Sequence, residues 1–420
     1  MKKVHQTGRI TAITNARNFD GERVINDQTV VINGASISAV GGAVPAGAAL
    51  VNAQGATLMP GLIDAHVHTS LDGLRDALAF GVTTELEMQG HWTAQDRKEV
   101  AEHDDIADIR SAGMGITAPG GHPSELFPEG EDPGDDANHH PTEDGQRHGF
   151  VAPFASTPEE ATHFVDQLVA NGSDYIKIMI EEGSVLSAPG LPMLNNETIA
   201  AAVRAAHRHN KLAIAHTLTV ATTQQAITAG MDGLAHLFLD RPHTPELVAA
   251  IAQSGAFVTP CLVLNSSIMG HPATDLAADE RVSSKLSQAW LNTLRSCFNT
   301  FPQGNFDDVL ATVAALHKAG VDILTGTDVS APISHLGGLA HGASVHHELQ
   351  LLVAAGLTTI EALRAATATP ARRFGLTDRG RIVPGARADL LLVDGDPITN
   401  ISDTLSISAV WRRGVRLTIH

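Results

Sequence analysis

Hydrophobic and polar positions follow three successive patterns along this chain. Residues 1 to 57 contain short segments of alternating character at residues 9–14, 29–32 and 36–40, with turn residues between them. Asn33-Gly34 separates the last two segments, and Asn-Gly between alternating runs is typical of a type I′ hairpin. This first part is therefore predicted to form short β-strands.

The middle of the chain, residues 58–375, alternates short apolar runs with Ala-rich stretches of helical period. Such alternation favours parallel strands joined by crossover helices, and eight units predict a TIM (β/α)8 barrel of the α/β class. Strands are predicted to begin near Leu58, Val82, Gly115, Tyr175, Leu212, Gly233, Ala256 and Asp322. Helices are predicted at residues 159–170, 196–209, 220–229, 244–253 and 307–319.

The strand pattern returns near the C-terminus, at residues 388–393 and 407–419. We therefore predict that residues 1–57 and 376–420 together form one small β-sandwich domain beside a barrel of residues 58–375. A chain of 420 residues is long enough to bury a large core in this arrangement.

Charge and cysteine content restrict the partners. The formal net charge is −18, which repels nucleic acid and anionic lipid, so we expect neither as a partner. Cys261 and Cys297 are too few for a disulfide framework and match no zinc motif, so two reduced thiols are expected. The basic N-terminus lacks a following apolar stretch, and no segment is long enough to span a bilayer. We expect a cytoplasmic protein.

Two histidines at the end of an apolar run carry the strongest chemical signal. His66 and His68 are separated by one residue on a predicted strand. Residues i and i+2 of a strand point to the same face, so both imidazoles can reach one metal ion. A strand that ends in histidines is more often simply solvated, and the pair alone does not establish a metal site.

Further candidate ligands follow other apolar runs, and each lies at the end of its own predicted strand. With about 30 residues per βα unit, their spacing places them after strands one, four, five, six and eight of a barrel. Active sites of such barrels are built at the carboxyl ends of the strands. The candidates are His66 and His68, then Lys177, His216, His236 and Asp328.

Two long segments interrupt the alternating pattern. Residues 119–153 follow the third predicted strand and contain His122 and the pair His139-His140. His122 lies closest to the strand end and is our candidate for binding the substrate carbonyl or the oxyanion, with a solvated loop histidine as the alternative. Residues 263–305 include a helical stretch near 282–300, which is expected to pack, to form a lid or to contribute an oligomer surface.

Taken together, the motifs resemble those of the amidohydrolase superfamily, and most closely its imidazolonepropionase-like and prolidase-like branch. The resemblance covers nearly the whole chain. It rests on the run of residues 59–68, Tyr175-Ile176-Lys177, the single histidines 216 and 236, residues 325–328, and the tail segments 366–371 and 380–390.

This resemblance implies a TIM barrel with a β-sandwich built from both termini and a site for two divalent ions. By position, His66, His68 and Asp328 would hold the more buried ion, and His216 and His236 the more exposed one. Lys177, carboxylated by CO2, would bridge them. Zinc is the expected metal, with Mn2+, Fe2+ and Ni2+ as alternatives. Imidazolonepropionases use one metal and lack the bridging lysine, so Lys177 argues against that activity.

The residue types themselves also favour metal-assisted hydrolysis. A neutral lysine amine in a desolvated pocket can add CO2 and become a carbamate whose two oxygens span two cations. The ions would share a hydroxide and polarise the scissile carbonyl. Asp328 is the natural proton shuttle, because it can take a proton from the nucleophile and deliver it to the leaving nitrogen.

One segment departs from the dipeptidase pattern. Glu181 and Glu182 stand where that branch has small residues, so an anionic dipeptide is a poor fit if these acids face the pocket.

The predicted function is hydrolysis of an amide-type C–N bond in a small molecule: a cyclic amide, an N-acyl or peptide-like amide, a urea or a carbamate. Ester, lactone or phosphoester hydrolysis is the alternative, and a non-catalytic relative with the same fold is the third reading. A homo-oligomer is expected.

Overall fold

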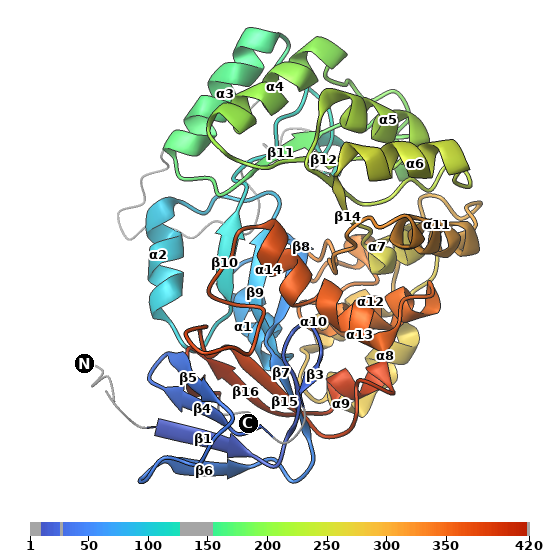
Figure 1. Ribbon diagram of the computed structural model, residues 1–420. Helices are drawn as coiled ribbons and strands as arrows, with labels where there is room; N and C mark the ends of the chain where they lie inside the picture. Colours follow the sequence, from blue (N-terminus) through green and yellow to red (C-terminus); the bar gives the residue numbers. More distant parts are fainter. Residues whose placement is uncertain (1–9, 26–27, 127–153, 418–420) are drawn as a thin grey trace.

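The computed structural model describes residues 10–25, 28–126 and 154–417. The loop histidines His139 and His140 lie outside these residues. Within them, parallel strands alternate with helices in one part of the molecule, while mixed sheets built from both ends of the chain form a smaller part (Figure 1). None of the described helices is long and apolar enough to cross a membrane.

Two parallel sheets form the centre of the larger part. The first has the order β10-β9-β8 and the second the order β11-β12-β13-β14. These strands are short and almost entirely buried, as expected for strands covered by helices. Their bounds are β8 Leu62–Val67, β9 Val82–Glu87, β10 Asp108–Ser111, β11 Ile176–Met179, β12 Ala213–His216, β13 Gly233–Ala235 and β14 Phe257–Thr259.

Isolated parallel bridges join the two sheets at both ends. Ile116 pairs with Ile178 of β11, Val258 of β14 pairs with Ile323, and Val67 of β8 pairs with Val329. The segment 322–329 therefore lies between β14 and β8, and the backbone amide of Asp328 donates to the carbonyl of His66 at 2.7 Å. The segment predicted as the last strand thus lies beside the first, but it forms isolated bridges and not a continuous strand.

Helices cover these sheets from outside, and several begin with the caps that their sequences suggest. Thr157 and Thr219 each form a capping box, and Pro158 occupies the first turn of α3. The helices after β8 and β9 are α1 Leu71–Ala79 and α2 Ala94–Glu102. The next group is α3 Pro158–Ala170, α4 Asn196–Arg208, α5 Val220–Ala229 and α6 Pro245–Ser254. The remaining helices are α7 Leu262–Ile268, α8 Thr274–Ala278, α9 Glu280–Ser283, α10 Gln288–Leu294, α11 Phe306–Lys318, α12 Ala343–Ala354, α13 Thr359–Ala365 and α14 Ala368–Arg373.

The smaller part contains two mixed sheets with a shared apolar core. One sheet has the order β5-β4-β1-β6 and the other β17-β16-β15-β7-β2-β3. Strands from both ends of the chain lie side by side there, blue and dark red in Figure 1. The predicted division between residues 57 and 58 falls inside β7. The bounds are β1 Ile10–Thr14, β2 Arg17–Phe19, β3 Val24–Ile25, β4 Val30–Asn33, β5 Ser36–Val40, β6 Ala49–Asn52, β7 Thr57–Pro60, β15 Leu390–Val393, β16 Ile407–Arg412 and β17 Val415–Arg416.

Three local predictions need correction. The helix expected near residues 282–300 is two short helices, α9 and α10, because Ser287 caps the second one instead of continuing the first. The third strand is Asp108–Ser111 rather than a strand from Gly115, and residues 116 and 117 form only isolated bridges. The hairpin after Asn33 is present, but Gly34 alone of its two loop residues has positive φ, which excludes a type I′ turn.

A buried charge cluster ties the two parts together. Asp108 on β10 accepts from Arg387 Nη1 at 2.8 Å and from Arg379 Nη1, and lies 3.5 Å from Arg412 Nη2. The three arginines come from the C-terminal segment, and Arg412 lies on β16. Burial opposes the ionisation of Asp108, but the three guanidinium groups hold its pKa well below the usual range.

Candidate metal centre

β8 delivers both predicted histidines to one end of the parallel strands. His66 is buried, whereas the side chain of His68, just beyond the strand, is 27% exposed. Asp64 fixes the strand against the neighbouring segment, because its Oδ1 accepts from the amides of His66 and Thr327 at 3.2 and 3.1 Å. His68 Nδ1 lies 3.1 Å from the carbonyl oxygen of Gln89. If Nδ1 donates there, Nε2 is the free nitrogen that faces the site.

Asp328 is the point at which the imidazoles converge. Its Oδ1 lies 2.9 Å from His66 Nε2 and 3.0 Å from His68 Nε2, and its Oδ2 lies 3.9 Å from His236 Nε2. The backbone at Asp328 is left-handed, with φ of 61°. Non-glycine residues in this region are strained and cluster at functional sites. The structure thus brings Asp328 together with His66 and His68.

Three neighbouring strands supply the other predicted ligands. Lys177 lies within β11, His216 ends β12, and His236 directly follows β13 with φ of 71°. The ring centroids of His216 and His236 are 4.7 Å apart, and those of His66 and His236 are 4.6 Å apart. The adjacent order β11-β12-β13 is the reason that residues distant in sequence meet here.

The donor set fits divalent metal ions. Among the described residues, His66 Nδ1, Lys177 Nζ, His216 Nε2 and His236 Nδ1 are buried without a hydrogen-bond partner. Buried polar atoms are normally paired, so four such nitrogens in one cluster call for a ligand. Burial lowers the pKa of His66 to about 3 and those of His216 and His236 well below the usual value. Neutral imidazoles are the form that binds metal.

Lys177 and Asp328 have complementary protonation properties. Burial lowers the pKa of Lys177 to about 8, so a fraction of its amine is neutral near pH 7. Burial opposes ionisation of Asp328, but electrostatic interaction with His66 and His236 and hydrogen bonds from His66 and His68 hold its pKa well below the usual value. The site thus combines a buried, partly neutral amine with an ionised carboxylate.

Beside this cluster lies a second group built around His122. The His122 ring stacks on that of His216 with centroids 4.3 Å apart, and its Nδ1 is 2.5 Å from Glu125 Oε1. The structure therefore brings His122 to the site. Glu181 is buried, with Oε2 3.4 Å from His216 Nε2, and its other oxygen accepts from the amide of Gly183. Glu182 instead accepts from Ser184.

Cys261, expected from the sequence to be an ordinary reduced thiol, lies beside these candidate ligands. Two groups of three side chains have ligand atoms that all lie within 4.8 Å of one another. One group is His66, His68 and Asp328, and the other is His66, His236 and Cys261. Cys261 comes two residues after the end of β14. The rule that polar groups follow strand ends would have found it.

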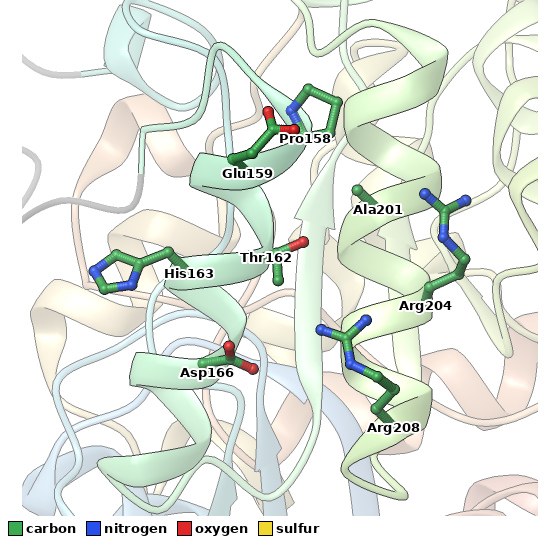
Figure 2. A pocket seen from close by; sticks show the side chains of 8 residues that line it. All are labelled: Pro158, Glu159, Thr162, His163, Asp166, Ala201, Arg204 and Arg208. Atoms are coloured by element: carbon green, nitrogen blue, oxygen red, sulfur yellow. The ribbon is translucent and has the colours of Figure 1, made fainter.

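A separate groove lies between α3 and α4 on the outer layer of helices (Figure 2). Its lining is mixed in charge, with Glu159 and Asp166 on one helix and Arg204 and Arg208 on the other. None of the candidate ligands lines it. This groove is therefore separate from the strand-end cluster.

Comparison with known proteins identifies the family. The amidohydrolase family pattern matches residues 57–417, and the chain belongs to that family. An adenine deaminase from Methanoregula boonei is 42% identical over 72 residues, which cover 17% of this chain and 13% of that protein. An imidazolonepropionase from Cereibacter sphaeroides is 40% identical over 102 residues, 24% of this chain and 22% of that protein. The chain thus spans only a small part of these two relatives.

Solved structures extend the similarity to the whole chain. An amidohydrolase has a TM-score of 0.73 and 23% identity, with 98% of this chain and 99% of that chain covered. A Xaa-Pro dipeptidase with bound methionine has a TM-score of 0.72 and 21% identity, with 97% and 99% covered. Ochratoxinase from A. niger has a TM-score of 0.73 and 21% identity, with 98% and 96% covered. These similarities imply a TIM barrel with a small second domain.

Proposed function

We propose that this protein is a binuclear metal-dependent hydrolase that cleaves an amide-type C–N bond in a small molecule. The observation that carries the proposal is the convergence of three imidazole Nε2 atoms on Asp328, beside a buried and unpartnered lysine amine. Bound divalent ions would polarise the scissile carbonyl and activate water near neutral pH.

The strand-end residues divide into two ligand groups. His66, His68 and Asp328 would hold one ion, and His216 and His236 would hold the other. Lys177 on β11 interacts electrostatically with His66 and His216, and its neutral amine would add CO2 to give a carbamate and one proton. The carbamate would supply oxygen ligands to the ions, which a protonated ammonium cannot do.

Asp328 and His122 supply the proton transfers and the polar contact that the reaction needs. Asp328 accepts the proton of the attacking water and returns it to the leaving nitrogen, because its carboxylate is ionised and lies among the ligands. Glu125 Oε1 lies 2.5 Å from His122 Nδ1 and so holds the ring in a fixed orientation. A ring held in this way can contact the substrate carbonyl oxygen.

Glu181 sets the charge of the substrate. Its carboxyl group is buried beside His216, and it interacts electrostatically with His122. Burial raises the pKa of Glu181 to about 7, so a carboxylate on the substrate would meet a partly ionised carboxyl group near neutral pH, whereas a neutral or cationic amide would not face this repulsion. The favoured substrates are therefore neutral or cationic amides, cyclic amides, ureas and carbamates.

Metal content tests the centre directly. Protein purified without chelator is expected to contain two divalent ions per chain, with zinc as the expected metal. Lys177→Ala should lower metal content and activity together, and short carboxylic acids should partly restore both by occupying the vacated position. A metal content near zero that added ions cannot raise would refute the centre. Full activity in Lys177→Arg would refute the carbamate, because a guanidinium stays cationic.

A substrate screen tests the reaction and the proposed charge preference. Matched N-acyl compounds that differ only in a neutral, cationic or anionic group are expected to rank with the anionic member lowest in kcat/KM. Lactones and phosphoesters in the same screen should be poorer substrates than amides. Preferred hydrolysis of anionic dipeptides would overturn the role of Glu181, and preferred lactone hydrolysis would overturn the C–N assignment.

A further inference from the structure

Cys261 occupies a rigid position next to the proposed centre. It is fully buried, and its thiol donates weakly to the carbonyl oxygen of Thr259 at a donor–acceptor distance of 3.6 Å. Its backbone is left-handed, with φ of 50°. Glu348 secures the following turn, because its two carboxylate oxygens accept from the amides of Leu262 and Val263 at 2.9 and 2.8 Å. The sulfur is therefore held in place by two neighbouring elements.

The surroundings of this sulfur are those of a ligand. Donor atoms of Cys261, His66 and His236 all lie within 4.8 Å of one another, and all three residues are buried. The two imidazoles each keep an unpartnered buried nitrogen. Ligands on a tetrahedral zinc ion are about 3.4–3.8 Å apart, given Zn–N and Zn–S bonds of about 2.1 and 2.3 Å. Donor atoms within 4.8 Å of one another are therefore close to the spacing needed to bind one ion.

We propose that Cys261 is a metal ligand whose sulfur coordinates one of the two ions of the proposed centre, in the space that it shares with His66 and His236. The inference rests on the proposed metal centre and adds a thiolate to its imidazole and oxygen ligands. On binding, the S–H bond breaks, a metal–sulfur bond forms and the proton leaves to solvent. A soft sulfur ligand selects Zn2+, Co2+ or Cd2+ over harder ions such as Mn2+.

Cobalt substitution tests this contact spectroscopically. Co2+ added to the metal-free full-length protein gives visible bands wherever it binds, and a near-ultraviolet sulfur-to-cobalt charge-transfer band only where sulfur is a ligand. We expect that band in the wild type and in the control Cys297→Ser, because Cys297 is only partly buried and belongs to no candidate ligand group. It should be lost in Cys261→Ser and Cys261→Ala. The alanine variant guards against misfolding caused by a buried hydroxyl.

The possible outcomes separate this inference from the proposed function. Visible bands in the wild type without the charge-transfer band would overturn sulfur ligation while leaving the metal centre in place. A charge-transfer band that persists in both Cys261 variants would also overturn it. Failure of the folded wild type to bind Co2+ at all would count against the proposed centre, and the inference would fail with it.

Discussion

Asp328→Asn is expected to lower turnover by on the order of 10²–10⁴ while metal content falls only modestly. Asparagine keeps the size of the side chain and one carbonyl oxygen, but it cannot accept a proton. The carboxylate of Asp328 contacts His66 and His68 and lies near His236, so the substitution removes the base without displacing the histidines. Turnover and metal content measured on the same preparation test this expectation.

The pH profile distinguishes a proton shuttle from a simple ligand. Asp328 is ionised across the neutral range because its pKa is well below the usual value. The wild-type rate should fall at acid pH with an apparent pKa that belongs to the coupled site. The acid side of this pH–rate profile should change in Asp328→Asn. Asp322→Asn is the matched control, because Asp322 belongs to the same segment but pairs with Arg372 and Arg373. If Asp328→Asn kept its full metal content and nearly wild-type turnover, the shuttle role would be wrong and Asp328 would be only a ligand.

The clustering of these residues could be predicted in large part from local rules. His66 and His68 share a face through the two-residue period of a strand, and His216 and His236 lie at or just after the carboxyl ends of adjacent strands. Lys177, predicted at a strand end, is instead the second residue of β11. The segment of Asp328, predicted as the last strand, forms only isolated bridges but lies beside β8. Parallel strands collect their carboxyl ends at one place, so strand order alone brings these residues together.

Other features depend on partners that no local pattern reveals. The period of β9 suggests a half-exposed strand, yet Glu85 and Glu87 are both buried. Glu85 is paired with His341, and Glu87 accepts from Ser111 and Trp92. His341 is distant in sequence, Trp92 lies in the irregular segment after β9, and Ser111 ends the neighbouring strand β10. The sequence likewise does not determine that Glu181 faces His216 while Glu182 turns toward Ser184.

Asp108→Asn is expected to destabilise the protein by about 3–5 kcal/mol at neutral pH, because it leaves buried guanidinium groups without their shared carboxylate. Asp108 and Arg412 are almost fully buried, and Arg379 is only slightly exposed. Asp378→Asn is the control, since its half-exposed carboxylate pairs with Arg379 and Arg387 at the same junction. An exposed pair contributes about 0–1 kcal/mol.

The same substitution carries a defined pH dependence. The folded pKa of Asp108 is depressed by Arg379, Arg387 and Arg412 despite burial, so its stabilisation is fully present above the unfolded pKa of about 3.9. It is lost as pH falls below that value toward the folded pKa. Denaturation of wild type and Asp108→Asn can be followed by circular dichroism. Their midpoints should differ by a constant amount near neutral pH and by a smaller amount in acid. A gap no larger than that of Asp378→Asn, or one that widens in acid, would show that the cluster does not stabilise this junction.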